Sequence, residues 1–131
     1  MFRNILLAAA LAAGLNPFVH SAFAGAGDYE FQAVAAETKK GDDVVVAVRL
    51  VHKPTNKPVD GAVIIRTRID MSPDKMADMV SPVAAVEARE PGTYAFKTDL
   101  PMAGRYLFSL AAKVQGEPET VTGKVILKAV K

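Results

Sequence analysis

The sequence predicts an all-β domain, an immunoglobulin-like antiparallel β-sandwich of about seven strands. Apolar and polar side chains alternate along most of residues 29–129, which is typical of strands with one buried face. Clusters of glycine, proline and acidic residues separate these runs at the short spacing of sandwich domains. No segment of ten or more residues in this region sustains the 3.6-residue period of a helix.

The first 24 residues have the pattern of a cleavable secretory signal peptide. Arg3 gives a positive start, Ile5 to Ala13 form an apolar core, and Ala22-Phe23-Ala24 places small residues at both recognition positions. The apolar run is 9 residues long, whereas a membrane-spanning helix needs about 20. We therefore expect cleavage after Ala24 rather than a retained anchor. Residues 25–131 would then form one soluble periplasmic domain without membrane insertion.

The predicted strands follow in order, and each ends where turn-forming residues gather. In the second strand, valines at alternate positions share one face, and in the third, Arg66 and Arg68 are expected to face solvent. The longest apolar stripe runs from Tyr106 to Val114 in the sixth strand, which we expect at the centre of the core. The seven strands are predicted at 29–37, 43–52, 61–69, 82–89, 93–98, 105–114 and 119–129.

The segment between the third and fourth strands is too long for a tight turn. Ser72-Pro73-Asp74 places a capping hydroxyl, a first-turn proline and an acid where a helix would begin. We therefore expect a single helical turn from Pro73 to Met79. Met76 and Met79 would then lie three residues apart on one side of that turn.

The methionines beyond residue 24 all fall in two predicted loops, one after the third strand and one after the fifth. They are Met71, Met76, Met79 and Met102. If successive strands alternate in direction, these loops lie at the same end of the sandwich, and His52 lies at the opposite end. Thioethers are soft, uncharged ligands that prefer Cu(I), so the four methionines form a candidate Cu(I) site. Three aspartates between them would add an attractive negative field, at Asp70, Asp74 and Asp78.

A second interpretation needs no metal, because methionine also fills irregular gaps where loops close over the end of a sandwich. The spacing of the aspartates does not match a calcium loop, and solvated capping explains them better. His52 is interpreted as a solvated turn residue rather than a ligand. The residues alone leave both the metal-binding and the packing interpretation open.

Composition excludes several other functions. Cysteine is absent, so thiol catalysis and thiolate metal sites are ruled out. Arg3 lies in the signal peptide, so 15 of the 16 basic residues and all 14 acidic residues remain, a net charge of +1 with both signs interspersed. No nucleic-acid partner is indicated. An enzyme is not expected, because His52 is isolated and no Gly-x-Ser-x-Gly elbow occurs.

Four short motifs carry a family resemblance: Lys57 to Val63, Asp70-Met71, Glu90 to Tyr94 and Leu100 to Tyr106. With the apolar strand that follows, they resemble the FixH-like/YtkA-like domain family over about residues 42 to 130. The resemblance implies an extracytoplasmic immunoglobulin-like sandwich with a role in copper handling, in cytochrome oxidase maturation or as an accessory beside a metal transport system.

Carried over by position, the methionine-bearing segment of the family falls on Met71, Met76 and Met79, and its Met-x-Gly element on Met102 and Gly104. Two features depart from the family pattern. The N-terminal membrane helix of FixH proper is lacking, and Tyr106 stands where tryptophan is common. The first departure argues against a role inside a membrane-bound assembly complex.

Two functions are compatible with these observations. In the first, a soluble periplasmic metal-handling accessory binds Cu(I) through Met71, Met76, Met79 and Met102. It passes the ion to a partner such as a metal transporter or a cytochrome oxidase assembly protein. In the second, the same apolar end is a metal-free module that docks onto a protein of a transport or oxidase-assembly system.

Overall fold

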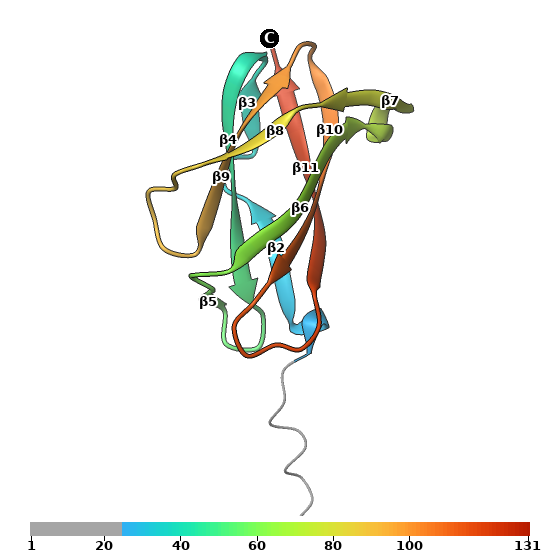
Figure 1. The fold of residues 1–131 in the computed structure, drawn as a ribbon. Coiled ribbons are helices and arrows are strands. Elements are labelled where there is room, and N and C mark those ends of the chain that lie inside the picture. Colours follow the sequence, from blue (N-terminus) through green and yellow to red (C-terminus); the bar gives the residue numbers. More distant parts are fainter. Residues whose placement is uncertain (1–24) are drawn as a thin grey trace, which may run out of the picture.

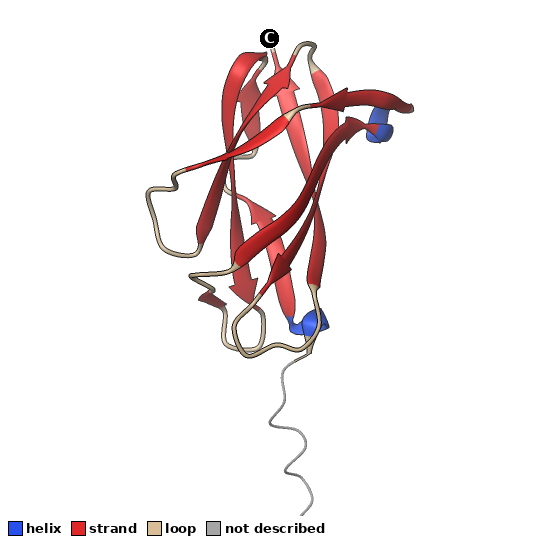
Figure 2. Cartoon of the chain, in the orientation of Figure 1, coloured by secondary structure: helices blue, strands red, loops and turns tan. Residues whose placement is uncertain are grey.

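The computed structural model describes residues 25–131, which fold into two facing β-sheets (Figure 1). The expected signal peptide, residues 1–24, lies outside the described residues. Strands and loops make up the domain, together with two short 3-10 turns, η3 (Ala26–Asp28) and η4 (Ser72–Asp74) (Figure 2). The predicted immunoglobulin-like β-sandwich is confirmed. Within residues 25–131, no helix has the length and apolar character to cross a membrane.

One sheet, called the β10 sheet here, has the strand order β3-β11-β10-β6-β7. Its strands are β3 (Glu37–Lys39), β11 (Val121–Val130), β10 (Gly104–Lys113), β6 (Val63–Met71) and β7 (Met76–Ser81). The other, called the β4 sheet, has the order β2-β4-β9-β8. Its strands are β2 (Tyr29–Ala33), β4 (Gly41–His52), β9 (Thr93–Leu100) and β8 (Val83–Val86), with the short β5 (Lys57–Pro58) paired to β4. Neighbouring strands are antiparallel except β3 and β11, which are parallel.

The core lies between the sheets and is built from the alternating positions of their central strands. On β10, Tyr106, Phe108 and Leu110 are buried, as the longest apolar stripe predicted. The ring of Phe108 meets Phe96 of β9 edge to face, with centroids 5.1 Å apart, which joins the two sheets through their middle strands. The central position predicted for the sixth strand is therefore confirmed.

The described chain contains ten strands where about seven were expected. The predicted first strand, 29–37, is split: β2 pairs with β4, and bends at residues 34–36 carry the chain to β3, which pairs with β11 in the other sheet. The run Ala33-Val34-Ala35-Ala36 contains no glycine, proline or charged residue, so the sequence gives no sign of the change of sheet. The short β5 and the strand β7 are the other additions.

The predicted helical turn from Pro73 to Met79 is wrong. The right-handed turn is limited to η4, because Lys75 adopts a left-handed conformation at φ 65° and donates its N–H to the Ser72 carbonyl at 2.9 Å. The chain reverses there, and Met76 begins β7, which pairs with β6. Met76 is partly buried against the core whereas Met79 is exposed, so the two do not lie together on one side of a helical turn.

Candidate methionine site

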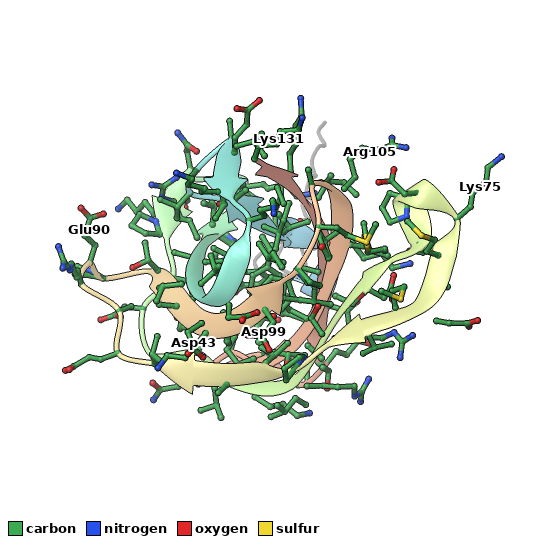
Figure 3. The ribbon with its side chains drawn as sticks, turned by 90° about the horizontal axis from the view of Figure 1, so that it is seen from above. Asp43, Lys75, Glu90, Asp99, Arg105 and Lys131 are labelled. Carbon is green, nitrogen blue, oxygen red and sulfur yellow. The ribbon has the colours of Figure 1, made fainter. Side chains whose placement is uncertain are left out.

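Two turns distant in sequence meet at one end of the sandwich, here named the methionine pole after Met71, Met76, Met79 and Met102. One is the β6–η4–β7 turn and the other is the β9–β10 turn (Figure 1). Arg105 joins them: its Nε donates to Asp74 Oδ1 at 2.9 Å and its Nη2 donates to the Pro73 carbonyl at 2.8 Å. Figure 3 shows the pole from above, with sulfur atoms on the side of the domain that carries Lys75 and Arg105.

Gly104 makes the close approach of the two turns possible. Its φ of 152° lies in a region that side chains disfavour. A Cβ there would lie 2.6 Å from Asp74 Oδ2 and 2.8 Å from the Met71 ε-methyl. The thioether of Met71 therefore lies against the residue two positions after Met102.

The four methionines differ in exposure. Met71 is 1% exposed and belongs to the core, and its cross-strand partner Met76 is partly buried against the same core. Met79 on β7 and Met102 in the β9–β10 turn are 43% and 39% exposed. The pole thus places two methionines in the packed interior and two at the surface.

The backbone of the β9–β10 turn is fixed by a tyrosine. The Tyr106 hydroxyl donates to the Met102 carbonyl at 2.8 Å and accepts the Met102 N–H at 3.3 Å. Tyr106 is 1% exposed, so this bond links the turn to the core. Tyr106 thus contributes a hydroxyl to this turn as well as a ring to the core.

Two of the three aspartates of the pole form ion pairs with arginines: Asp70 with Arg68, and Asp74 with Arg105. Burial of Asp70 raises the pKa of its carboxyl, but hydrogen bonds from Ser72 and Arg68 outweigh burial and hold the pKa below its usual range. The pKa of Asp74 is also lowered, chiefly by the backbone N–H and guanidinium of Arg105. The third aspartate, Asp78, is exposed and makes no ion pair within residues 25–131. The attractive field is therefore weaker than the sequence suggested.

The pole offers sulfur as its soft donor. Within residues 25–131, no three histidine, aspartate or glutamate side chains are grouped to hold a metal ion. His52 lies at the opposite end, where its ring is 5.2 Å from that of Tyr29 and its Nδ1 is 2.8 Å from Thr55 Oγ1. It is the last residue of β4 and half-buried, rather than a solvated turn residue. Thioethers are the ligands available at the pole for a soft cation.

Sequence reasoning missed the residues that hold the pole together. Asp74 was interpreted as a capping and field residue, and Arg105 was not singled out, although the two join the turns. No signal in one sequence marks an ion pair between residues 31 positions apart. Gly104 was noted only as part of the Met-x-Gly element. The position must be glycine because Asp74 and Met71 of the neighbouring turn leave no room for a Cβ.

The sequence matches the profile of a known family. The family profile described as YtkA-like matches residues 23–111. The chain belongs to the YtkA-like family. The match includes all four methionines of the pole and ends before β11, so it differs in extent from the resemblance over residues 42 to 130. No curated protein matches the sequence of this YtkA-like domain.

Two solved structures show distant likeness to this YtkA-like domain. Titin domain M7, from a structure at atomic resolution, shares 12% identity at a TM-score of 0.35, with 78% of this chain and 95% of that chain covered. The ZirS C-terminal domain shares 7% identity at a TM-score of 0.40, with 98% of this chain and 86% of that chain covered. The sandwich architecture is established by the strand pairing itself.

Proposed function

We propose that this YtkA-like domain is a periplasmic metal-handling accessory that binds Cu(I) through thioethers at the methionine pole. One observation carries the proposal. The Met71 ε-methyl lies against Gly104, which brings the end of β6 next to the turn that contains Met102. Thioethers from two distant stretches of chain therefore belong to neighbouring turns, which supports the proposal that they bind a single soft cation. The proposal includes no catalytic step.

The exposure of the methionines suggests how an ion would be taken up and released. Met79 and Met102 are accessible from solvent, whereas Met71 and Met76 lie deeper. Thioethers are neutral and need no deprotonation, so capture is independent of pH over a wide range. A neutral donor set does not cancel the charge of Cu(I), which favours transfer to a partner. We propose a metal transporter or a cytochrome oxidase assembly protein as that partner.

The test is an anaerobic Cu(I) titration of residues 25–131 against a competing chromogenic chelator. We expect one equivalent to bind, and we expect Met79→Leu with Met102→Leu to lower the affinity at least about tenfold, because leucine keeps the apolar volume but removes the donor. Val80→Leu is the matched control, since Val80 is an exposed apolar residue on the same strand. Unchanged affinity in the double variant would refute the Cu(I) site.

A second candidate is a metal-free docking module, and the burial of Met71 favours it. Met71 fills the core against Gly104, as a packing residue does, while Met79, Val80 and Met102 leave apolar surface at the pole. The two functions make opposite demands on leucine at Met79 and Met102. Docking onto an immobilised transporter or assembly subunit would survive leucine but fail with Met79→Lys, whereas Cu(I) binding would fail with both.

A further inference from the structure

A basic trough lies on the outer face of the β10 sheet, and no methionine lines it. Its volume is about 540 Å³, which is in the range of small-molecule sites. Side chains from β6, β10 and β11 line it, and those used below are Arg66, Arg68, Ser109, Ala111, Thr122 and Lys124.

The register of the strands explains why the surface is hollow there. Ser109 of β10 lies between Arg68 of β6 and Lys124 of β11. In the next outward-facing row, Ala111 of β10 lies between Arg66 and Thr122. Short side chains on the middle strand therefore form a floor, and long side chains on the flanking strands form two walls.

The charge of the trough has one sign. Three cationic side chains line it and no acidic side chain does. Arg68 is partly neutralised, because its Nε contacts Asp70 at 2.8 Å. Arg66 and Lys124 make no ion pair within residues 25–131. The charges of Arg66 on β6 and Lys124 on β11 thus lie on opposite walls of the trough.

The floor is apolar, with two hydroxyls beside it. Ala111 is 2% exposed although it points outward, so its methyl is covered by its neighbours. The aliphatic stems of arginine and lysine add apolar area along the walls, while Ser109 and Thr122 can donate hydrogen bonds. Two neighbouring strand spacings, about 10 Å in total, separate the backbones of the walls.

We propose that this trough binds a small organic anion with two acidic groups, carboxylates or phosphates, at the ends of a short apolar body. One acidic group contacts Arg66 and the other contacts Lys124 and Thr122, while the body lies between the aliphatic stems of the two walls. Guanidinium groups suit carboxylate and phosphate oxygens, because their N–H groups match the spacing of two oxygens. No methionine lines the site, and the proposal does not depend on the function proposed for the methionine pole.

The test compares glutarate with valerate, which has the same five carbons and a single charge, by isothermal titration calorimetry at low salt. Pyrophosphate is the phosphate probe. We expect a dianion to bind about tenfold more tightly than valerate, because it adds one charge-assisted contact. Arg66→Gln and Lys124→Gln should each reduce that affinity about tenfold. Lys97→Gln, on the exposed part of β9 in the β4 sheet, makes the same charge change and should leave it unaltered.

Three outcomes would overturn the proposal. Neither dianion binds at millimolar concentration, valerate binds as tightly as glutarate, or Lys97→Gln weakens binding as much as Arg66→Gln. Vesicles of phosphatidylglycerol and of phosphatidylcholine distinguish a membrane source of phosphate. Capture by the anionic vesicles without binding of either free dianion would also contradict the small-molecule site. Thermal melts of each variant show whether the fold is retained.

Discussion

At each end of the sandwich a tyrosine hydroxyl holds a loop by bonding to its backbone. The two tyrosines differ in how far along the sequence their partners lie. At the methionine pole, the Tyr106 hydroxyl bonds both backbone groups of Met102, four residues away. At the opposite end, the Tyr94 hydroxyl donates to the Val59 carbonyl at 2.6 Å and accepts the Ala62 N–H at 3.0 Å, more than thirty residues away. The first tyrosine shapes one turn, whereas the second ties a long loop to β9.

The glycines show the same contrast. A Cβ on Gly104 at the pole would meet the ends of two side chains, Met71 and Asp74. A Cβ on Gly92 at the opposite end would overlap the Pro58 ring and approach the backbone of Val59 at 3.4 Å. Side-chain ends can shift, but a ring and a backbone cannot. The pole can therefore accommodate an added methyl more easily than the opposite end can.

The largest expected effect is the loss of stability on Gly92→Ala. Left-handed φ and overlap with Pro58 should together lower the free energy of unfolding by about 3 kcal/mol. Gly104→Ala should cost less, about 2 kcal/mol, because the Met71 methyl can move. Gly116→Ala is the control for backbone strain alone, since its φ is 89° and nothing lies within 4 Å of its Cβ position; about 1 kcal/mol is expected there. Urea denaturation measures all three, and a greater loss for Gly104→Ala than for Gly92→Ala would reverse the comparison.

Removing the tyrosine hydroxyls should give the next largest effects. Tyr94→Phe should lower the free energy of unfolding by about 1.5 kcal/mol, because it leaves two backbone groups without a partner. Tyr106→Phe should cost about 1 kcal/mol and act locally, so hydrogen exchange at the Met102 amide should accelerate more than exchange in β10. Uniform acceleration across the domain in Tyr106→Phe would show that this tyrosine also ties the fold together.

The two ends should also respond to opposite extremes of pH. At the pole, the pKa values of Asp70 and Asp74 are lowered. Lowered carboxyl pKa values contribute stability above the unfolded value, near pH 4, which is lost as pH falls through the folded values. At the opposite end, burial raises the pKa of Tyr94, and burial with the Glu117 hydrogen bond raises that of Tyr29. Raised tyrosine pKa values contribute stability below about pH 10, which is lost as pH rises through the folded values.

Residue-resolved NMR across a pH series measures this difference, and it is the smallest effect predicted. Amide signals of residues 70–80 should shift only below about pH 4, and those around residues 58–62 only above about pH 10, because the pKa values of Asp70 and Asp74 are lowered and that of Tyr94 is raised. Asp70→Asn should remove part of the acid response and leave the alkaline response unchanged. Loss of signal at both ends together in acid would contradict the assignment of the acid response to the pole.

Much of the fold followed from side-chain alternation. The stripes on β4 and β10 are strong, because both strands are central and each buries one full face. The edge strands were harder to predict. Most residues of strand β7 are exposed, so it lacks a buried stripe. Ser72-Pro73-Asp74 is compatible with either a helix start or a 3-10 turn. The left-handed backbone of Lys75 ends the turn after Asp74.

The sequence predicted which methionines lie at one end of the sandwich, but not which of them are buried. Counting strand directions placed Met71 and Met102 at the same end, and the contact of Met71 with Gly104 agrees with that count. The count could not tell which thioethers would be buried, because burial depends on the packing of both turns. The trough was missed for a similar reason. Arg66 and Arg68 were expected to face solvent, but only the register with Ser109 and Lys124 shows that they form a wall.

The position of β11 has a consequence for how the domain assembles. This strand, Val121–Val130, lies between β3 and β10, and Gly123 lies beneath the ring of Phe31 from the other sheet. Ribosomes deliver a chain from its N-terminus, so β3 and β10 emerge before the strand that joins them. The edges of β3 and β10 that β11 covers therefore stay unpaired until the ten residues of β11 have left the exit tunnel.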